Sequence, residues 1–349
     1  MPDDTQIFHD LCRSFGNGFG RYKTETILFQ ISGVLFVNCT LITLLSSGNY
    51  PAGRHCKQIY VHKMKLFIIS LSLILNTSIV FGYSNNLPAQ DTSKPFVIGR
   101  VETFHSSVLG EDRILNIYLP DGYNQADSVQ YPVIYLLDGS ADEDFIHIAG
   151  LVQFCSFEWV KQVPKSIVVG IANVDRRRDF TFPTTIQGDK SANPTSGHSD
   201  KFIRFLESEV LPQMEHKYKV SGNRTLIGES LGGLLATEIL LKNAALFNKY
   251  IIVSPSLWWD NGSILTLNSA IYTPAFNRPT DIYIGVGKEG LTPTAIPRVM
   301  EVDANLLADK LSAAKNKSLN IRFDYLPAEN HGTIMHQAVL NAFRLFSKK

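Results

Sequence analysis

Short, strongly apolar runs alternate along this chain with segments whose apolar residues recur at helical spacing, and this alternation limits the folds open to it. The runs predict strands at 96–108, 113–119, 131–139, 166–173, 224–230, 250–255, 281–287 and 319–327, and the helical periods predict helices at 200–218 (interrupted by Pro212), 231–247, 297–314 and 333–347. Strands that are apolar throughout are buried on both faces of a sheet. The sequence therefore predicts an α/β fold with a mostly parallel central sheet, helices on both faces, and an antiparallel pair formed by the first two strands.

One short motif stands where a predicted strand meets a predicted helix. Residues 228–232 read Gly-Glu-Ser-Leu-Gly, which is the G-x-S-x-G pattern in its required strand–turn–helix context. The glycines leave room where strand and helix approach closely, and the sharp turn exposes the hydroxyl of Ser230. We expect Ser230 to be a nucleophile and the N–H of Leu231 to point at a developing oxyanion. The alternative is that Ser230 only caps the following helix.

A nucleophilic serine needs a base, and in hydrolases with this motif the acid and then the histidine follow the serine along the chain. His331 lies on the loop between the last predicted strand and the closing helix, which is the position expected for the base. His198 and His336 do not follow a strand end in this order. The sequence therefore predicts that His331 activates Ser230.

The acid is expected just after the strand 281–287. Glu289 is the first carboxylate there, and it would hold the imidazole in the correct tautomer. Glu301 and Asp303, on the next predicted helix, are the alternatives, and a Ser–His dyad without a third partner is another.

The loop after the strand 131–139 is expected to supply the second oxyanion donor. The candidates are the backbone N–H groups of Gly139 and Ser140.

Substrate-binding side chains are expected at two further strand ends. An arginine cluster, Arg176-Arg177-Arg178-Asp179, follows the strand 166–173, and we expect Arg178 to bind an anionic or catecholate part of the substrate. The alternative is a loop held by arginine–carboxylate pairs with Asp175 or Asp179. Trp258 and Trp259 follow the strand 250–255, and we expect one to pack in the core and the other to line an acyl or aromatic pocket.

The front of the chain differs from the rest. Residues 64–82 have a basic start, an apolar run and a small-residue end, and they read as a secretory signal peptide. We therefore expect residues 1–63 to be a mis-assigned upstream extension. The alternative is a membrane hairpin formed by 26–47 and 66–82. In either case we expect 83–94 to be a linker and 95–349 a single exported catalytic domain, periplasmic or secreted, which contacts a membrane only if 1–82 are retained.

The amino-acid composition limits the classes of partner and cofactor that we expect for this chain. The chain carries 33 basic and 32 acidic residues, a formal net charge of +1, so nothing indicates nucleic acid as a partner. Three of the four cysteines precede Met64, and Cys155 on its apolar segment is expected to be a buried small hydrophobe. The His and Cys spacing does not match a zinc site. We expect a small-molecule ester as substrate and neither metal nor organic cofactor, while the oligomeric state stays open.

Six segments together resemble the putative-esterase family of α/β hydrolases, over roughly residues 96–347: IYLPDGY, YPVIYLLDG, IVVGIANVDRRRDFTFP, GESLGG, SPSLWWD and ENHGT. That family includes enterochelin (siderophore) esterases, S-formylglutathione hydrolases, feruloyl esterases and antigen-85 mycolyltransferases, and the chain looks most like the siderophore branch. The resemblance implies the α/β-hydrolase fold, the nucleophile at Ser230, the base at His331 and an oxyanion loop at Gly139. It leaves Glu289 open, because the acid position varies within the family.

The predicted activity is hydrolysis of carboxylic esters through an acyl-enzyme on Ser230. An acyltransferase that uses the same acyl-enzyme is one alternative, and a non-catalytic binding protein on the same fold is another.

Overall fold

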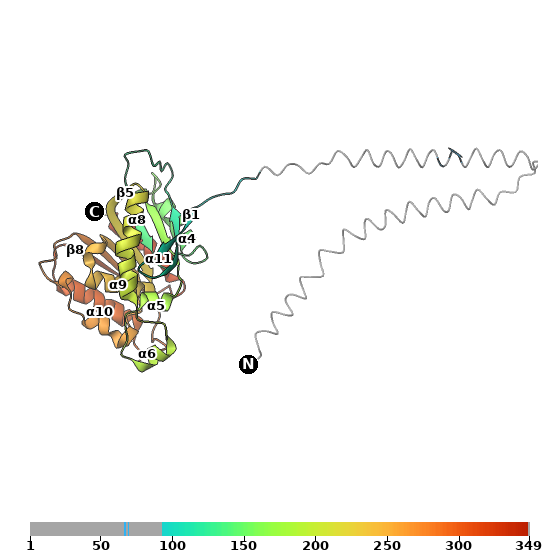
Figure 1. The fold of residues 1–349 in the computed structure, drawn as a ribbon. Helices are drawn as coiled ribbons and strands as arrows, with labels where there is room; N and C mark the ends of the chain where they lie inside the picture. Colours follow the sequence, from blue (N-terminus) through green and yellow to red (C-terminus); the bar gives the residue numbers. More distant parts are fainter. Residues whose placement is uncertain (1–65, 68, 70–92, 348–349) are drawn as a thin grey trace, which may run out of the picture. The chain divides into compact units, whose positions relative to one another are not determined.

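The computed structural model describes residues 66, 67, 69 and 93–347 (Figure 1). The predicted extension (1–63), nearly all of the predicted signal peptide (64–82) and most of the predicted linker (83–94) lie outside these residues and stay predictions, as does the membrane hairpin. Contacts group Pro95–Lys349 into one compact unit. None of the helices in the described ranges has the length and apolar character that a membrane crossing requires.

The centre of this unit is one eight-stranded sheet with the order β1-β2-β4-β3-β5-β6-β7-β8. The strands are β1 (Arg100–Ser106), β2 (Glu111–Tyr118), β3 (Tyr131–Leu136), β4 (Ile167–Ile171), β5 (Val220–Glu229), β6 (Lys249–Val253), β7 (Thr280–Gly287) and β8 (Leu319–Leu326). β2 pairs antiparallel with both β1 and β4, and every other neighbouring pair is parallel. The mostly parallel sheet with an antiparallel opening pair is therefore confirmed.

Helices cover both faces of the sheet. The longer segments are α4 (Phe145–Cys155), α7 (Ser199–Phe205), α8 (Leu211–Lys217), α9 (Leu231–Lys242), α10 (Met300–Ala313) and α11 (Ile334–Phe346). Side chains of α4 and α11 share one buried cluster, and those of α7 to α10 share the other. Successive strand residues alternate between the clusters, as Ile251 and Ile252 do, because side chains in a strand point to opposite faces.

Several boundaries differ from the sequence-based expectation. The segment 200–218 is not broken by Pro212: a π-helical turn, η1 (Leu206–Val210), joins α7 to α8, and Pro212 lies in the first turn of α8, where no backbone N–H is needed. The helix expected at 231–247 ends at Lys242 and is followed by a short 3₁₀ turn, η2 (Ala244–Leu246).

Four helical segments lie in the loops and were not predicted: three are too short to show a helical period, and left-handed residues at 260–262 interrupt the longest. They are α5 (Arg176–Phe180), α6 (Gln187–Ala192), η3 (Trp259–Thr266) and η4 (Ala270–Tyr272). The first matters for function, since it follows β4 directly at the carboxyl end of the sheet.

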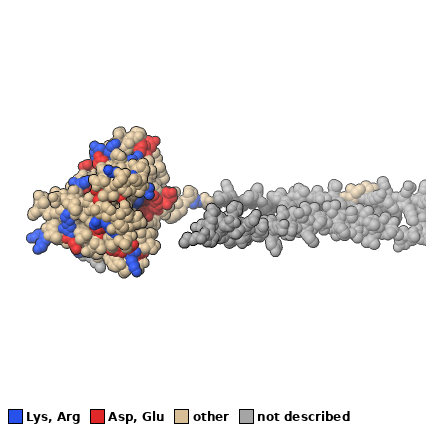
Figure 2. Space-filling view, turned by 90° about the horizontal axis from the view of Figure 1, so that it is seen from below, with Lys and Arg blue, Asp and Glu red and all other residues tan. Residues whose placement is uncertain are grey.

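Acidic and basic side chains both occur on the face of this unit that Figure 2 shows, in keeping with a formal net charge of +1. The parallel strands place their carboxyl ends at the same edge, which is where ligands bind in such sheets. The loops there carry Asp138, Arg176, Ser230, Glu289 and His331.

Candidate active site

Ser230 lies at a sharp turn between β5 and α9. Its backbone has φ 59° and ψ −119°, a strained conformation for a residue with a side chain. A Cβ on Gly228 would lie 2.4 Å from the carbonyl oxygen of Gly232, so this crossing of strand and helix requires glycine. The Ser230 side chain makes no capping hydrogen bond to α9. The turn therefore leaves the partly buried Ser230 hydroxyl free of the helix, and its geometry is not that of a helix cap.

His331 lies between Ser230 and Glu289. Its Nε2 is 3.0 Å from Ser230 Oγ and its Nδ1 is 2.6 Å from Glu289 Oε2. A carboxylate only accepts hydrogen bonds, so Nδ1 carries the proton and Nε2 is free to accept from the serine hydroxyl. The three residues come from the loops after β5, β7 and β8, and the structure brings them together as the sequence predicts.

Among the three candidate acids, Glu289 is the one beside the histidine. Its side chain is 4% exposed, and the Ser254 hydroxyl donates to its other oxygen. Glu301 instead accepts from the backbone N–H groups of Glu289, at 2.8 Å, and Gly290, at 3.0 Å.

Asp303 is occupied elsewhere, because its carboxylate pairs with the guanidinium of Arg298 at 2.6 and 2.8 Å. Glu301 therefore steadies the loop that carries Glu289, and Asp303 takes no part. His336 lies against His147 with ring centroids 5.8 Å apart, and His198 lines a different small cavity with Arg178.

The surroundings shift the pKa of the His331 imidazole and of two carboxyl groups at this site. The hydrogen bond to Glu289 raises the pKa of His331 above 6.5, although burial opposes the shift. Burial, together with the nearby charges of Asp144 and Asp138, raises the pKa of the Glu229 carboxyl to about 8. Burial next to Asp138 raises the pKa of Asp144 to about 6. At neutral pH the Glu229 carboxyl therefore favours its protonated form.

The prediction of Gly139 as an oxyanion donor is wrong. Its N–H donates to the carbonyl of Ile171 at 3.0 Å, and its own carbonyl accepts from Asn116 at 2.8 Å, so the peptide is used in holding β3 to β4 and β2. A Cβ at Gly139 would lie 2.3 Å from the Cα of Gly170, which explains the glycine. Ser140 remains: its N–H, like that of Leu231, has no hydrogen-bond partner within the described part of the chain.

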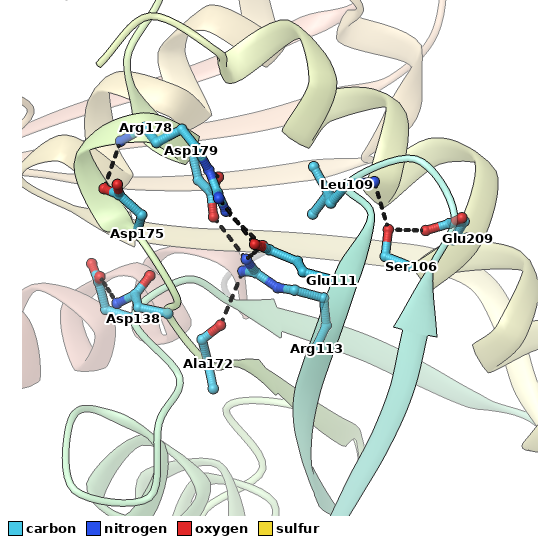
Figure 3. A network of polar contacts seen from close by, with 11 residues as sticks. Ser106, Leu109, Glu111, Arg113, Asp138, Ala172, Asp175, Arg178, Asp179 and Glu209 are labelled. Atoms are coloured by element: carbon cyan, nitrogen blue, oxygen red, sulfur yellow. Dashed lines mark hydrogen bonds and ion pairs between the residues drawn. The ribbon is translucent and has the colours of Figure 1, made fainter. Parts of the chain in front are cut away.

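Arg178 is not a substrate-binding residue in this structure, so that prediction is wrong. Its guanidinium bonds Asp179 at 2.7 Å and both oxygens of Glu111, at 2.5 and 2.9 Å. Figure 3 shows these contacts as part of a buried network that also includes Arg113, whose side chain is fully buried and bonds Asp179 at 2.8 Å. The alternative, a loop held by arginine–carboxylate pairs, describes the structure: Arg178 pairs with Asp179 and also with Glu111, a partner that the sequence did not indicate.

The arginine at the site is Arg176, two residues earlier in the same cluster. It lines a cavity of about 420 Å³ together with Ser230, His331 and the carboxyl groups of Asp138, Glu143, Asp144 and Glu229. Its guanidinium pairs with Asp138, and this pairing raises its pKa although burial opposes the charge. The sequence placed the cluster near the site but held no signal for choosing among its members, because the choice depends on how α5 turns.

The two tryptophans have different environments. Trp259 is 1% exposed, and its indole N–H donates to the carbonyl of Phe182 at 2.8 Å, so it belongs to the core and does not contact substrate. Trp258 is half-buried against the same core cluster and does not line the cavity at Ser230. Its role as a pocket residue stays a prediction. Within the described residues no group of three or more His, Cys, Asp or Glu side chains is placed to hold a metal ion.

Comparison with known proteins identifies the family to which the chain belongs. A family model described as Putative esterase matches residues 106–331, more than half of the chain. The chain belongs to this esterase family. The esterase is 29% identical over 268 residues to the ferri-bacillibactin esterase BesA of Bacillus subtilis (strain 168), a match that covers 72% of this chain and 91% of that protein.

Two solved structures are similar to the esterase. One is an IroE-like serine hydrolase from Shewanella oneidensis, with 30% identity, a TM-score of 0.61, and coverage of 72% of this chain and 80% of that one. The other is the BES protein from Bacillus cereus, with 28% identity, a TM-score of 0.63, and coverage of 75% and 100%. The α/β-hydrolase fold is thus confirmed, and the chain is a serine hydrolase that acts on carboxylic esters.

Proposed function

We propose that the esterase cleaves its substrate through an acyl-enzyme on Ser230, with His331 as general base and Glu289 as the acid that orients it. The observation that carries this proposal is the position of the His331 ring, 3.0 Å from the serine oxygen on one side and 2.6 Å from the carboxylate on the other. Geometry of this kind activates a hydroxyl that is otherwise a weak nucleophile.

In the proposed reaction the Ser230 oxygen bonds to the ester carbonyl carbon while His331 Nε2 takes the hydroxyl proton. The negative charge that forms on the carbonyl oxygen is held by the N–H groups of Leu231 and Ser140. The tetrahedral species expels the alcohol, which receives the proton from His331. Water, deprotonated by the same imidazole, then attacks the acyl group, and the acid is released with Ser230 restored.

For the substrate we propose a siderophore-type ester. Support comes from the relatives, since a protein similar over most of this chain is named a ferri-bacillibactin esterase and a similar structure is described as IroE-like. The cavity at Ser230 combines an arginine with several carboxyl groups, so it suits a polar substrate better than a long acyl chain.

The test is labelling and turnover of the purified protein. We expect a fluorophosphonate to label the wild type stoichiometrically and to leave Ser230→Ala unlabelled, with Ser208→Ala, at an exposed serine, labelled like the wild type. A cyclic catecholate triester should be hydrolysed faster than feruloyl or acyl-sugar esters. If the folded wild type is not labelled, the alternative of a non-catalytic binding protein is favoured. If an added alcohol becomes acylated, the acyltransferase alternative is favoured.

We also propose that the mature protein is exported after cleavage near Gly82. The support is the signal-like composition of 64–82, which is basic, then apolar, then small. The mass of the protein recovered outside the cytoplasm decides this: a terminus near residue 83 is expected, and one upstream of Met64 would contradict it.

A further inference from the structure

The loop after β6 begins with Ser254, the first residue of the segment SPSLWWD, and the steps of the proposed reaction do not use it. Ser254 is fully buried and has a φ of 39°, in the left-handed region that favours glycine. A side chain in that region costs free energy, and residues held there are concentrated at functional sites. The sequence nevertheless has serine and not glycine at this position, which indicates that the hydroxyl itself is needed.

Backbone hydrogen bonds fix the chain on either side of Ser254. Its own N–H donates to the carbonyl of Gly285 in β7 at 2.8 Å. The carbonyl of Val253 accepts from the N–H of Ser230 at 3.0 Å, and the N–H of Ser256 donates to the carbonyl of Ser230 at 2.9 Å. The loop therefore binds both backbone groups of the proposed nucleophile, and Ser254 takes its strained conformation between these two contacts.

From this position the Ser254 hydroxyl donates to Oε1 of Glu289, while Nδ1 of His331 lies 2.6 Å from Oε2 of the same carboxylate. The carboxylate is thus held at both oxygens. The Glu289 side chain is 4% exposed, so water is a poor substitute for the hydroxyl. Glu301 accepts from the backbone N–H of Glu289 at 2.8 Å and so fixes its main chain, whereas Ser254 contacts the carboxylate itself.

We propose that Ser254 is a positioning residue that orients the carboxylate of Glu289 against the imidazole of His331. This rests on the proposed function, because it requires Glu289 to be the acid. The acid acts by fixing the tautomer and the orientation of the ring, and a carboxylate that is free to rotate does this less well. A misplacement of about 1 Å at a site of this kind lowers the rate by about 10²-fold.

The main test is Ser254→Gly, because glycine relieves the backbone strain while it removes the hydroxyl. We expect this variant to stay folded, with a Tm within about 4 °C of the wild type. Its kcat/KM for p-nitrophenyl acetate should fall by about 10–10²-fold. The loss should lie in kcat, since the acid acts on the imidazole and not on the ester.

Lys315→Gly is the matched control. Lys315 has a φ of 49° and is exposed, so glycine relieves similar strain there without removing a contact to the site. Its activity should equal that of the wild type. Ser254→Ala removes the hydroxyl and keeps the strain, so it provides the same comparison of activity if the glycine variant unfolds.

Two further measurements separate positioning from a purely structural role. If the carboxylate turns away from the ring, the hydrogen bond that raises the pKa of His331 weakens, and the midpoint of the pH–rate profile should move to lower pH. In a Glu289→Ala background, Ser254→Gly should lower kcat/KM by less than about twofold, because the group that Ser254 positions is already absent.

The proposal is wrong if Ser254→Gly is as active as the wild type, or if the midpoint of its pH–rate profile does not move. It is also wrong if Ser254→Gly loses as much activity in the Glu289→Ala background as in the wild type. Failure of the proposed function gives a different result, because Ser230→Ala or Glu289→Ala would then keep full activity.

Discussion

The proposed base, His331, faces a carboxylate on one side and a hydroxyl on the other, and this setting determines how its charge varies with pH. Its hydrogen bond to Glu289 raises its pKa above 6.5, so the folded protein holds this proton more tightly than a free histidine would. Only the neutral imidazole accepts a proton from Ser230. Activity should therefore appear as pH rises through a midpoint above 6.5.

We expect Glu289→Gln to move this midpoint of kcat/KM to lower pH, because the amide no longer favours the charged ring while burial still disfavours it. The maximum of kcat should fall by roughly 10²–10⁴-fold, since the tautomer is no longer enforced. The measurement is a pH–rate profile on p-nitrophenyl acetate. Glu158→Gln, at an exposed side chain, is the control, and an unshifted midpoint in Glu289→Gln would refute the assignment of the acid.

The raised pKa of Glu229 predicts that stability falls as pH rises, whereas activity is expected to rise with pH. Its folded pKa is about 8 against a usual 4.5, so between these values the unfolded chain is ionised and the folded protein is not. The folded state then loses stability as pH rises from about 4.5 to 8. Glu229→Gln removes this loss: relative to wild type it should gain on the order of a few kcal/mol at pH 8.5 and little at pH 5, as urea unfolding would reveal. Equal effects at both pH values would contradict the shift.

At the scale of elements, the buried network of Figure 3 holds α5 against the edge of the sheet. Arg113 on β2 is fully buried and bonds Asp179 of α5, whose side chain is 1% exposed, at 2.8 Å. Arg178, also on α5, joins the network through Glu111. Since Arg176 is on the same short helix, this network also fixes the backbone position of the arginine that lines the cavity at Ser230.

We expect Asp179→Ala to lower the free energy of unfolding by about 3–5 kcal/mol, because it leaves the buried guanidinium of Arg113 and the partly buried guanidinium of Arg178 short of a partner. Activity should fall as well, because α5 is no longer fixed. Urea unfolding and turnover of p-nitrophenyl acetate check both parts. Arg204→Ala, which breaks an exposed pair with Asp200 at 3.7 Å, should change stability by less than about 0.5 kcal/mol. A similarly small change in the free energy of unfolding for Asp179→Ala would mean that the network contributes little to stability.

The elements that the sequence predicted well are those with a repeating signal. Buried strands such as β6 and β7 are uninterrupted apolar runs, and the amphipathic α11 follows the helical period, so both types appear near their expected bounds. α5 has five residues, too few for a period, and its turns decide which arginine meets the cavity. That orientation is set by pairing with Glu111, which begins β2, and with Asp138, which follows β3, and neither pairing is visible from local sequence.

For the whole molecule, the order of motifs along the chain predicted that Ser230 and His331 would meet, because parallel strands bring their carboxyl ends together. It made Glu289 the first candidate for the acid but left Glu301, Asp303 and a Ser–His dyad open. The backbone donor in the proposed oxyanion loop was harder to predict. Choosing Ser140 over Gly139 requires knowing that the Gly139 N–H is used by Ile171, and this depends on how the turn after β3 lies against β4. Sequence thus indicated which loops form the site, while side-chain and peptide orientation came from the structure.

Both core clusters are built from residues of the unit Pro95–Lys349. We therefore expect a fragment 93–349 to fold alone and to keep ester turnover. Its Tm should lie within roughly 2–4 °C of the longer chain, the change that about 1 kcal/mol makes in a domain of this size. Scanning calorimetry of the fragment and the full chain, side by side, is the measurement. A fragment that aggregates or melts far lower would show that the earlier residues complete the core.

β8 is one of the two edge strands of the sheet, and the loop that follows it carries the imidazole of His331. Translation runs from the N-terminus, so the Ser230 hydroxyl emerges from the ribosome about a hundred residues before the imidazole of His331, its proposed base. Under the proposed mechanism, a nascent or partly exported chain therefore has no complete active site, and we expect hydrolysis to begin only after β8 has docked beside β7.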